Sequence, residues 1–169
     1  MRLTVLLLGW LLLVPLTGSG QIHWMSFPEA LAKSKTTGKK IFVFVHTDWC
    51  GWCRRMEHTT YLNPKVVRTI NRYYLPVKFN AESRAPISFK GKTYKFVHRG
   101  RGGYHDLAAQ LLDGKMTYPT LVFLDEHMNL IQAIPGYRKA GELVMIADYF
   151  GSNAYRSIPW ETYQKRHHP

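Results

Sequence analysis

The feature that most constrains this chain is the pair Cys50 and Cys53, the only two cysteines among its 169 residues. An apolar run over 41–45 ends shortly before them. A continuous run of β-branched and aromatic residues is typical of a strand that is buried on both faces. Two intervening residues hold both thiols within one turn of a helix that opens at Cys50, which is within reach of a disulfide. The sequence therefore predicts a central strand followed by a helix that carries the two thiols in its first turn.

The two thiols are predicted to have different roles. The unpaired N–H groups and the positive end of the helix dipole favour a thiolate at the first position, which makes Cys50 the nucleophile. Cys53, one turn further and less exposed, is the resolving thiol. Attack by Cys50 on a foreign disulfide, and then by Cys53 on the mixed disulfide, would release the reduced substrate and leave Cys50–Cys53 oxidised.

Two other interpretations of the cysteine pair stay open. The pair could be half of a zinc site, or it could be an inert structural disulfide. Zinc commonly takes four ligands, and neither a second C-x-x-C nor an H-x₃₋₅-H pair follows. His46 and His58 flank the cysteines, but one is expected on the preceding strand and the other beyond the first helical turns. A structural disulfide that closes so short a loop would stabilise the fold little. Redox chemistry is therefore favoured.

Length and composition indicate a single globular domain. The chain is 46% hydrophobic and 14% aromatic, which excludes a disordered protein, and its length suffices for one domain with a sizeable core. The formal net charge is +12. Such a balance could favour nucleic acid, acidic lipid or acidic protein partners. We see no recognition helix or aromatic-plus-basic motif, so no nucleic-acid partner is predicted.

Residues 1–20 are typical of a signal peptide. A short basic start precedes an apolar run over 3–14, and Gly18-Ser19-Gly20 supplies small residues that a signal peptidase accepts. The apolar run is shorter than the ~20 residues that span a bilayer. We therefore expect cleavage near Gly20 and an exported mature chain over 21–169, periplasmic or secreted, in a compartment where disulfides persist.

The rest of the chain alternates helices and strands. Helical patterns lie within 24–35, 64–74, 104–112 and 143–150, and strand patterns over 75–80, 120–124 and 130–134. A strand, a helix and a strand in that order imply a parallel pair, whereas the short turn before the last strand implies an antiparallel pair. The prediction is an α/β domain with a mixed sheet.

Two segments fall outside this alternation. Residues 81–104 carry six lysines or arginines against one glutamate, and they are expected to form an inserted basic loop or short hairpin. A solvated surface is favoured over a partner-docking surface there. The C-terminal extension over 152–169 contains Tyr155, Trp160 and Tyr163, and it is expected to pack as an extra short helix.

These features resemble the thioredoxin family over most of the mature chain. The motif from Trp49 to Cys53 follows a central strand and opens a helix as in that family, and Tyr118-Pro119-Thr120 looks like its cis-proline loop, which faces the disulfide. The resemblance is closer to exported bacterial thioredoxin-like proteins than to cytosolic thioredoxin. It implies a thioredoxin-like α/β fold, with a central mixed sheet of four to five strands flanked by helices, an insert before the cis-proline loop and an extra C-terminal helix.

The resemblance also implies a binding site and partners. Trp49, Gly51, Trp52 and Tyr118 would shape the entrance for substrate, and Pro119 would present backbone to a bound substrate chain. No metal or organic cofactor is implied beyond the redox-active cysteine pair. The expected partners are protein thiols and disulfides, with a membrane electron donor if the protein acts as a reductant outside the cytosol. A monomer is expected.

One departure from the family concerns proton transfer. The family carries a buried aspartate six residues before the nucleophile, and this place is Phe44 here. The lysine that accompanies the aspartate is kept as Lys78. Either water or a nearby group such as Glu57 or His46 is therefore expected to handle the proton of the resolving thiol, or the step is slower.

A second departure is the dipeptide Gly51-Trp52 between the cysteines. It lacks a histidine that would favour the thiolate and a more oxidising couple, so a protein-disulfide reductase is favoured over an oxidase or isomerase. Arg54 and Arg55 would act in the opposite direction, because cations near Cys50 stabilise its thiolate. The alternative function is a redox-inert thioredoxin-fold module that binds a partner or a metal.

Overall fold

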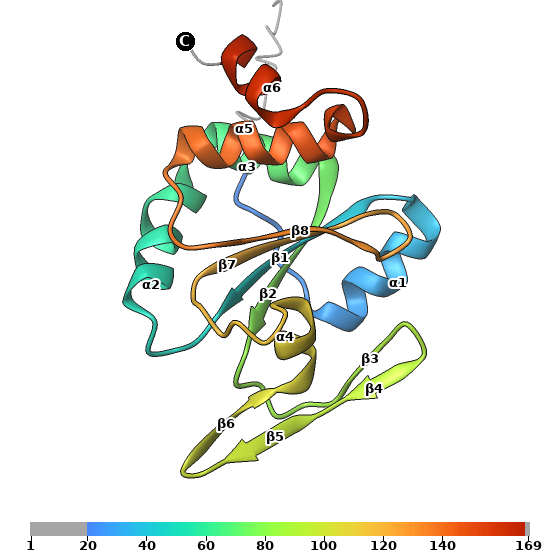
Figure 1. Ribbon diagram of the computed structural model, residues 1–169, viewed down its shortest axis with the longest axis vertical. Helices are drawn as coiled ribbons and strands as arrows, with labels where there is room; N and C mark the ends of the chain where they lie inside the picture. The colour runs from blue at the N-terminus through green and yellow to red at the C-terminus, as the bar shows by residue number, and fades with distance from the viewer. Residues whose placement is uncertain (1–19, 168–169) are drawn as a thin grey trace, which may run out of the picture.

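A four-stranded mixed sheet lies at the centre of the protein, in the order β2-β1-β7-β8 (Figure 1). The computed structural model describes residues 20–167, so the expected signal peptide lies outside the described residues except for its last position. The strands are β1 (Lys40–His46), β2 (Tyr74–Asn80), β7 (Thr120–Leu124) and β8 (Leu130–Pro135). β1 pairs with β2 in parallel and with β7 in antiparallel register, and β8 pairs with β7 in antiparallel register. The predicted central strand and both predicted pairings are confirmed.

Helices cover both faces of this sheet. In the described chain they are α1 (Phe27–Thr37), α2 (Gly51–His58), α3 (Pro64–Tyr73), α4 (Asp106–Leu111), α5 (Ala140–Gly151) and α6 (Trp160–His167), with 3-10 turns η1 (Thr60–Leu62) and η2 (Ala154–Arg156). Ser26 and Asn63 cap α1 and α3 through their side-chain oxygens, and Pro64 occupies the first turn of α3. Gly38 ends α1 in the left-handed region, with φ 64°. These local signals explain why the helices start and stop near the predicted places.

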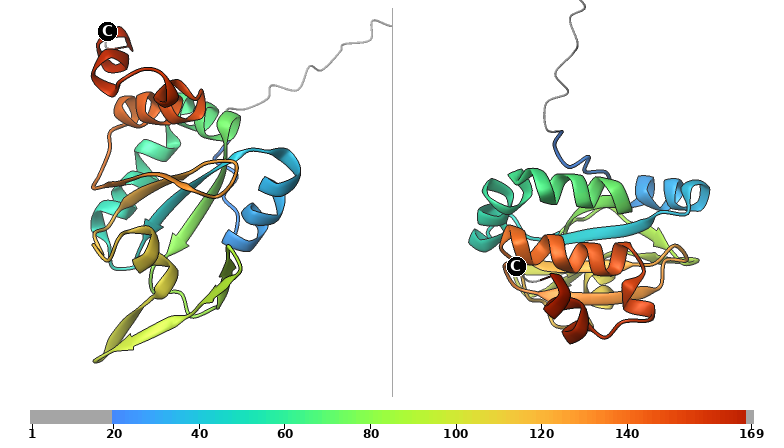
Figure 2. Two further views of the ribbon diagram at one scale, coloured as in Figure 1. Left: turned by 45° about the vertical axis from the view of Figure 1, so that its right-hand side comes forward. Right: turned by 90° about the horizontal axis from the view of Figure 1, so that it is seen from above.

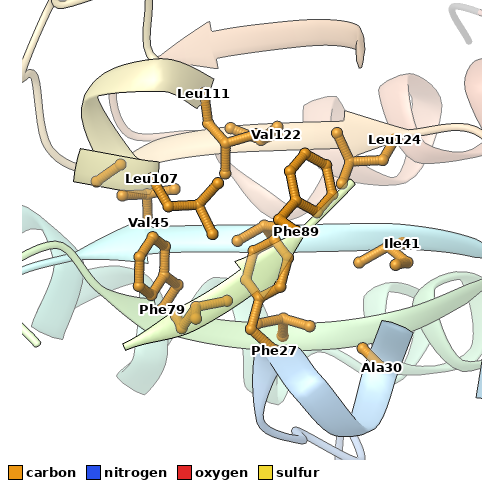
Figure 3. Close-up of a cluster of buried hydrophobic side chains, with 14 of the residues drawn as sticks. Phe27, Ala30, Ile41, Val45, Phe79, Phe89, Leu107, Leu111, Val122 and Leu124 are labelled. Atoms are coloured by element: carbon orange, nitrogen blue, oxygen red, sulfur yellow. The ribbon is translucent and has the colours of Figure 1, made fainter. Parts of the chain in front are cut away.

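Side chains of β1 alternate between two apolar cores, one on each face of the sheet. Val45 and its neighbours on one face join a core with α1 and α4, which Figure 3 shows in close-up. Phe42 and Phe44 enter the other core, which α2, α3 and α5 cover. Cys50 and Cys53 belong to this second core. The sheet therefore fixes the cysteine pair on the face that carries α2, α3 and α5.

The insert over 81–104 forms two hairpins, where the sequence predicted a loop or one hairpin. β3 (Ile87–Phe89) pairs with β4 (Lys92–Tyr94), and β5 (Phe96–Arg99) pairs with β6 (Gly102–His105). The first hairpin packs apolar side chains into the core beside α1 and α4. The second hairpin projects from the body of the protein (Figure 1).

The fourth helix begins later than predicted. The pattern predicted a helix from Tyr104, but Tyr104 lies in β6 and α4 begins at Asp106. His105 explains the shift, because its Nδ1 accepts a hydrogen bond from the N–H of Leu107 (3.2 Å) and so caps the first turn. The cap separates the hairpin from the helix.

The C-terminal extension forms an extra short helix, as predicted, and this helix packs against α5. The hydroxyl of Tyr163 in α6 donates to Asp148 Oδ2 (2.5 Å), and the hydroxyl of Tyr149 in α5 donates to the carbonyl oxygen of Ile158 (2.6 Å). Figure 2 shows α5 and α6 at the end of the molecule opposite the β5–β6 hairpin. Within residues 20–167, no helix has the length and apolar character needed to cross a membrane.

Candidate active site

Cys50 and Cys53 form a disulfide at the N-terminus of α2. Cys50 is the N-cap residue of the helix, and the backbone N–H of Cys53 donates to Cys50 Sγ (3.1 Å). Donors at this helix end, together with the helix dipole, favour negative charge. They would therefore stabilise a thiolate on Cys50 when the disulfide is reduced.

Both cysteines are buried in the disulfide form, although the sequence suggested an exposed nucleophile. Cys50 is 5% exposed and Cys53 is 1% exposed. The difference has a structural reason, since both residues pack in the core of α2, α3 and α5. Cys50 keeps the larger exposed fraction and is therefore the more accessible sulfur of the pair.

Two aromatic pairs flank the disulfide. Trp49 lies edge-on to Tyr118, with ring centroids 5.8 Å apart, and Trp52 lies against Tyr137 at 5.5 Å. Both tryptophans are exposed, at 64% and 55%. Exposed indoles that a second ring holds in place form an apolar surface on which a substrate segment can lie.

Tyr137 is a residue of this site that sequence reasoning missed. The guanidinium of Arg55 lies 5.4 Å from the Trp52 ring centroid and 5.8 Å from the Tyr137 ring centroid. Arg55 therefore joins the two rings through cation–π contacts. In the sequence, Tyr137 is marked only by its place directly after Gly136, which follows the last strand.

Trp49 is held by the first residues of the insert. Its indole Nε1–H donates to Glu82 Oε1 (3.0 Å), and Asn80 Nδ2–H donates to Asp48 Oδ1 in the same loop (3.0 Å). Arg54 Nη1–H donates to the carbonyl oxygen of Asp48 (2.7 Å). In the sequence, Glu82 was visible only as the one acidic residue of a basic segment. In the structure it positions a tryptophan beside the disulfide.

The Tyr118–Pro119 bond is cis, as the resemblance implied. Pro119 is buried, and its carbonyl oxygen accepts a hydrogen bond from the N–H of Gly136 (2.7 Å). Burial, with a smaller contribution from the charge of Glu82, raises the pKa of Tyr118 to about 12, so its hydroxyl stays neutral near pH 7. Gly51 is exposed, and a Cβ there would meet nothing within 4 Å. The space in front of Gly51 is therefore open.

A carboxylate reaches Lys78 from the helix instead of from the strand. Glu57 Oε2 lies 2.8 Å from Lys78 Nζ, and the two side chains are 31% and 36% exposed. Glu57 is four residues after Cys53 and so lies on the same face of α2. Phe44 is beside Lys78 in the β1–β2 register. Phe44 thus occupies the family's aspartate position, while Glu57 supplies the partner for the lysine.

His46 lies on the same face of β1 as Phe44. Its ring stacks on the Phe44 ring at a centroid distance of 5.6 Å. Burial lowers the pKa of His46, and the charge of Lys78 lowers it further, while Glu57 and Asp48 act in the opposite direction. His46 is therefore neutral near pH 7, and its lowered pKa makes it a weaker proton acceptor than an ordinary imidazole. Across residues 20–167, no three His, Cys, Asp or Glu side chains gather as a metal site would require.

Comparison with known proteins identifies the family. A family model described as a thioredoxin-like domain matches residues 27–151, which include the cysteine pair and the Tyr118–Pro119 loop. The chain belongs to the thioredoxin-like domain family. Solved structures agree with this fold. A thioredoxin from Thermus thermophilus has a TM-score of 0.57 at 19% identity, covering 83% of this chain and 99% of that one. A thioredoxin-fold protein from Helicobacter pylori has a TM-score of 0.56 at 15% identity, covering 77% and 80%.

Curated relatives of this thioredoxin-like chain match it over shorter stretches. An uncharacterized protein of Archaeoglobus fulgidus is 33% identical over 65 residues, and spermatogenesis-associated protein 20 of Mus musculus is 29% identical over 76 residues. These alignments cover 38% and 45% of this chain, and 51% and 10% of the two relatives. The predicted thioredoxin-like fold is confirmed, and the disulfide within it is consistent with thiol–disulfide exchange.

Proposed function

We propose that this protein is a thiol–disulfide oxidoreductase that acts on protein disulfides outside the cytosol. The observation that carries the proposal is the Cys50–Cys53 disulfide at the N-terminus of α2, where Cys50 Sγ accepts the N–H of Cys53. This arrangement provides one sulfur that can be a stabilised thiolate and a second sulfur that can attack it in the mixed disulfide, which releases the substrate thiolate.

The reaction passes two electrons in two exchange steps. The Cys50 thiolate attacks a substrate disulfide, so a Cys50–substrate bond forms, the substrate S–S bond breaks and one substrate thiolate leaves. The Cys53 thiolate then attacks Cys50 Sγ, which forms the Cys50–Cys53 disulfide and releases the second substrate thiolate. The protein is oxidised and the substrate is reduced. A dithiol donor must then reduce the pair again.

Substrate contact is assigned to the surface around the disulfide. Trp49 with Tyr118, and Trp52 with Tyr137, offer apolar area on both sides of Cys50. Gly51 leaves the approach open because it has no side chain. Pro119 is proposed to present backbone to the substrate chain, as the family resemblance implies.

Glu57 is proposed as the proton acceptor for Cys53, with Lys78 and His46 beside it. Cys53 must lose its proton before it attacks, and Glu57 lies one helical turn away on the same face of α2. The Lys78 ammonium lies 2.8 Å from Glu57 Oε2 and holds the carboxylate in position. Neutral His46 is a second acceptor on the neighbouring strand.

The direction and the compartment are part of the same proposal. A reductase is favoured because Gly51-Trp52 contains no histidine that would make the couple more oxidising. Export is inferred from the apolar segment over 3–14 and the small residues before Gln21, features typical of exported bacterial thioredoxin-like proteins. A reductant outside the cytosol needs a membrane partner that supplies electrons.

Trapping tests the proposed function. Reduced protein is mixed with a disulfide-linked peptide pair, and the products are separated after acid quenching. Wild type should release both peptide thiols, Cys53→Ser should accumulate a mixed disulfide at Cys50, and Cys50→Ser should give neither product. A wild-type protein that leaves the peptide disulfide intact would contradict the proposal and favour a redox-inert binding module.

A further inference from the structure

The β5–β6 hairpin has no role in the proposed function, yet it carries two exposed arginines, Arg99 and Arg101, within a strongly basic insert. The insert over 81–104 has six basic residues against one acidic residue, a net charge of +5 within a chain of +12. The tip of the hairpin, from His98 to Gly102, is exposed. Few of these cations are neutralised locally. Within residues 20–167, Lys92 is the one basic residue of the insert in an ion pair, at 4.0 Å from Asp106.

Aromatic rings hold two of the unpaired guanidinium groups. Arg84 lies over the ring of Phe96, 4.7 Å from its centroid, and Arg99 lies 5.7 Å from the ring centroid of Tyr104. A guanidinium that stacks on a ring keeps its N–H donors free at the edges. These donors match the oxygens of a carboxylate in a paired geometry.

The hairpin has a specific shape and is not a loose loop. A Cβ on Gly103 would lie 2.2 Å from the carbonyl oxygen of Val97 and 2.5 Å from the Phe96 ring, so only glycine fits there. Gly100 takes the left-handed conformation that the turn requires, with φ 55°. The cations are therefore presented on a defined two-stranded ribbon.

The base of the hairpin is joined to the active-site loop. The N–H of Ala81 donates to the carbonyl oxygen of His46 (2.8 Å), and the next residue, Glu82, holds the Trp49 indole. At the other end of the insert, the N–H of His105 donates to the carbonyl oxygen of Ala81 (2.6 Å). Both ends of the insert thus meet beside Trp49, which directly precedes Cys50.

We propose that the β5–β6 hairpin binds an acidic segment of the protein whose disulfide exchanges with Cys50 and Cys53, an inference that rests on the proposed function. A substrate chain that lies over Trp49 extends toward the base of the hairpin, where Glu82 joins the two. Unpaired cations attract acidic segments, raise the association rate and suppress partners of the same charge. A protein is favoured over nucleic acid because the hairpin is attached to the loop that carries the exchange site.

The test compares two disulfide-linked peptides that differ only in a flanking segment of glutamates or glutamines. The second-order rate constant for oxidation of the reduced protein is measured at ionic strengths of about 0.01 M and 0.15 M, where the Debye length is about 30 Å and about 8 Å. The variant carries Arg99→Gln and Arg101→Gln at the exposed tip. The control carries Lys165→Gln and Arg166→Gln in α6, which removes the same charge at the opposite end of the molecule (Figure 2).

At low salt, wild type and control should react with the acidic peptide about tenfold or more faster than with the glutamine peptide. Electrostatic steering typically raises association rates by a factor of about 10 to 10³. The tip variant should lose most of this preference, while all three proteins react equally with the glutamine peptide. Equal rates for both peptides in wild type, or a preference that survives in the tip variant, would overturn the docking proposal alone. Failure to react with either peptide would overturn the proposed function and the docking with it.

Nucleic acid is the competing occupant of the hairpin. A labelled single-stranded oligonucleotide that binds wild type at about 0.15 M salt, but not the tip variant, would assign the hairpin to nucleic acid if the acidic peptide shows no preference. That pair of results would overturn the proposal.

Discussion

Replacement of Glu57 by glutamine tests the proposed proton transfer. Glu57 is the carboxylate on the same helical face as Cys53, and it is paired with Lys78 at 2.8 Å. Glutamine keeps the size of the side chain and removes its ability to accept the proton. The ion pair is about one-third exposed on each side, so its loss should change the free energy of unfolding by less than about 1 kcal/mol. A slower reaction would then reflect chemistry and not unfolding.

The expected size follows from the ionisation of a thiol. A free thiol with its ordinary pKa of about 8.5 is about 3% thiolate at pH 7, against about 75% at pH 9. Full dependence on Glu57 would therefore slow resolution by about 30-fold at pH 7 and by less than about twofold at pH 9. Because Glu57 is 31% exposed, water can replace it in part. We expect a loss of about tenfold at pH 7.

Rapid mixing with acid quenching measures this step separately. At high peptide concentration, formation of the mixed disulfide is fast and the unimolecular attack by Cys53 sets the rate. Glu161→Gln, which removes an exposed carboxylate from α6, is the matched control and should behave as wild type. A Glu57→Gln rate equal to wild type at pH 7, or a deficit that is the same at pH 7 and pH 9, would refute the proposed role.

Three further predictions concern binding and stability. Trp49→Ala should raise KM for a protein disulfide by about fivefold or more, with little effect on a small disulfide, as expected for an aromatic hot spot; an equal effect on both would contradict a docking role. Phe44→Asp should lower the free energy of unfolding by more than about 3 kcal/mol in urea titrations, because the ring is fully buried and a charge there is costly; near-native stability would contradict this. Burial is the largest cause of a lowered pKa at both His46 and His105. Lys78 lowers the pKa of His46 further, whereas Glu57 and Asp48 oppose the shift at His46 and Asp106 opposes it at His105. The unfolded chain then binds more protons below about pH 6.5, so stability should fall from pH 7 to pH 5, and a urea midpoint that rises toward pH 5 would contradict it.

The sequence predicted the centre of the fold well because its signals there are local. The run 41–45 is apolar throughout, as a strand buried on both faces requires, and Asn63-Pro64 marks the start of α3 by its capping chemistry. The cysteine spacing located the N-terminus of α2. The cis bond before Pro119 could be expected only from the family resemblance, because the residues around a proline do not determine its isomer.

The parts that sequence reasoning missed depend on contacts between distant residues. The two hairpins of the insert have strands of three or four residues, too short for a clear alternation, and the first gains its stability from the core beside α1. Tyr137 reaches Trp52 and Glu82 reaches Trp49 only once the sheet brings their loops together. No local pattern marks such residues, so Tyr137 and the Glu82 anchor of Trp49 appeared only in the structure.

The reduction potential of the Cys50–Cys53 pair decides whether this protein acts as a disulfide reductase. The protein is equilibrated with glutathione buffers of graded ratio, and the free thiols are trapped and counted by mass. We expect one reversible two-electron couple near thioredoxin's value of about −270 mV, which Cys50→Ser and Cys53→Ser should each abolish. A couple near about −120 mV would contradict the reductase direction, and the absence of any reversible couple would contradict the redox function itself.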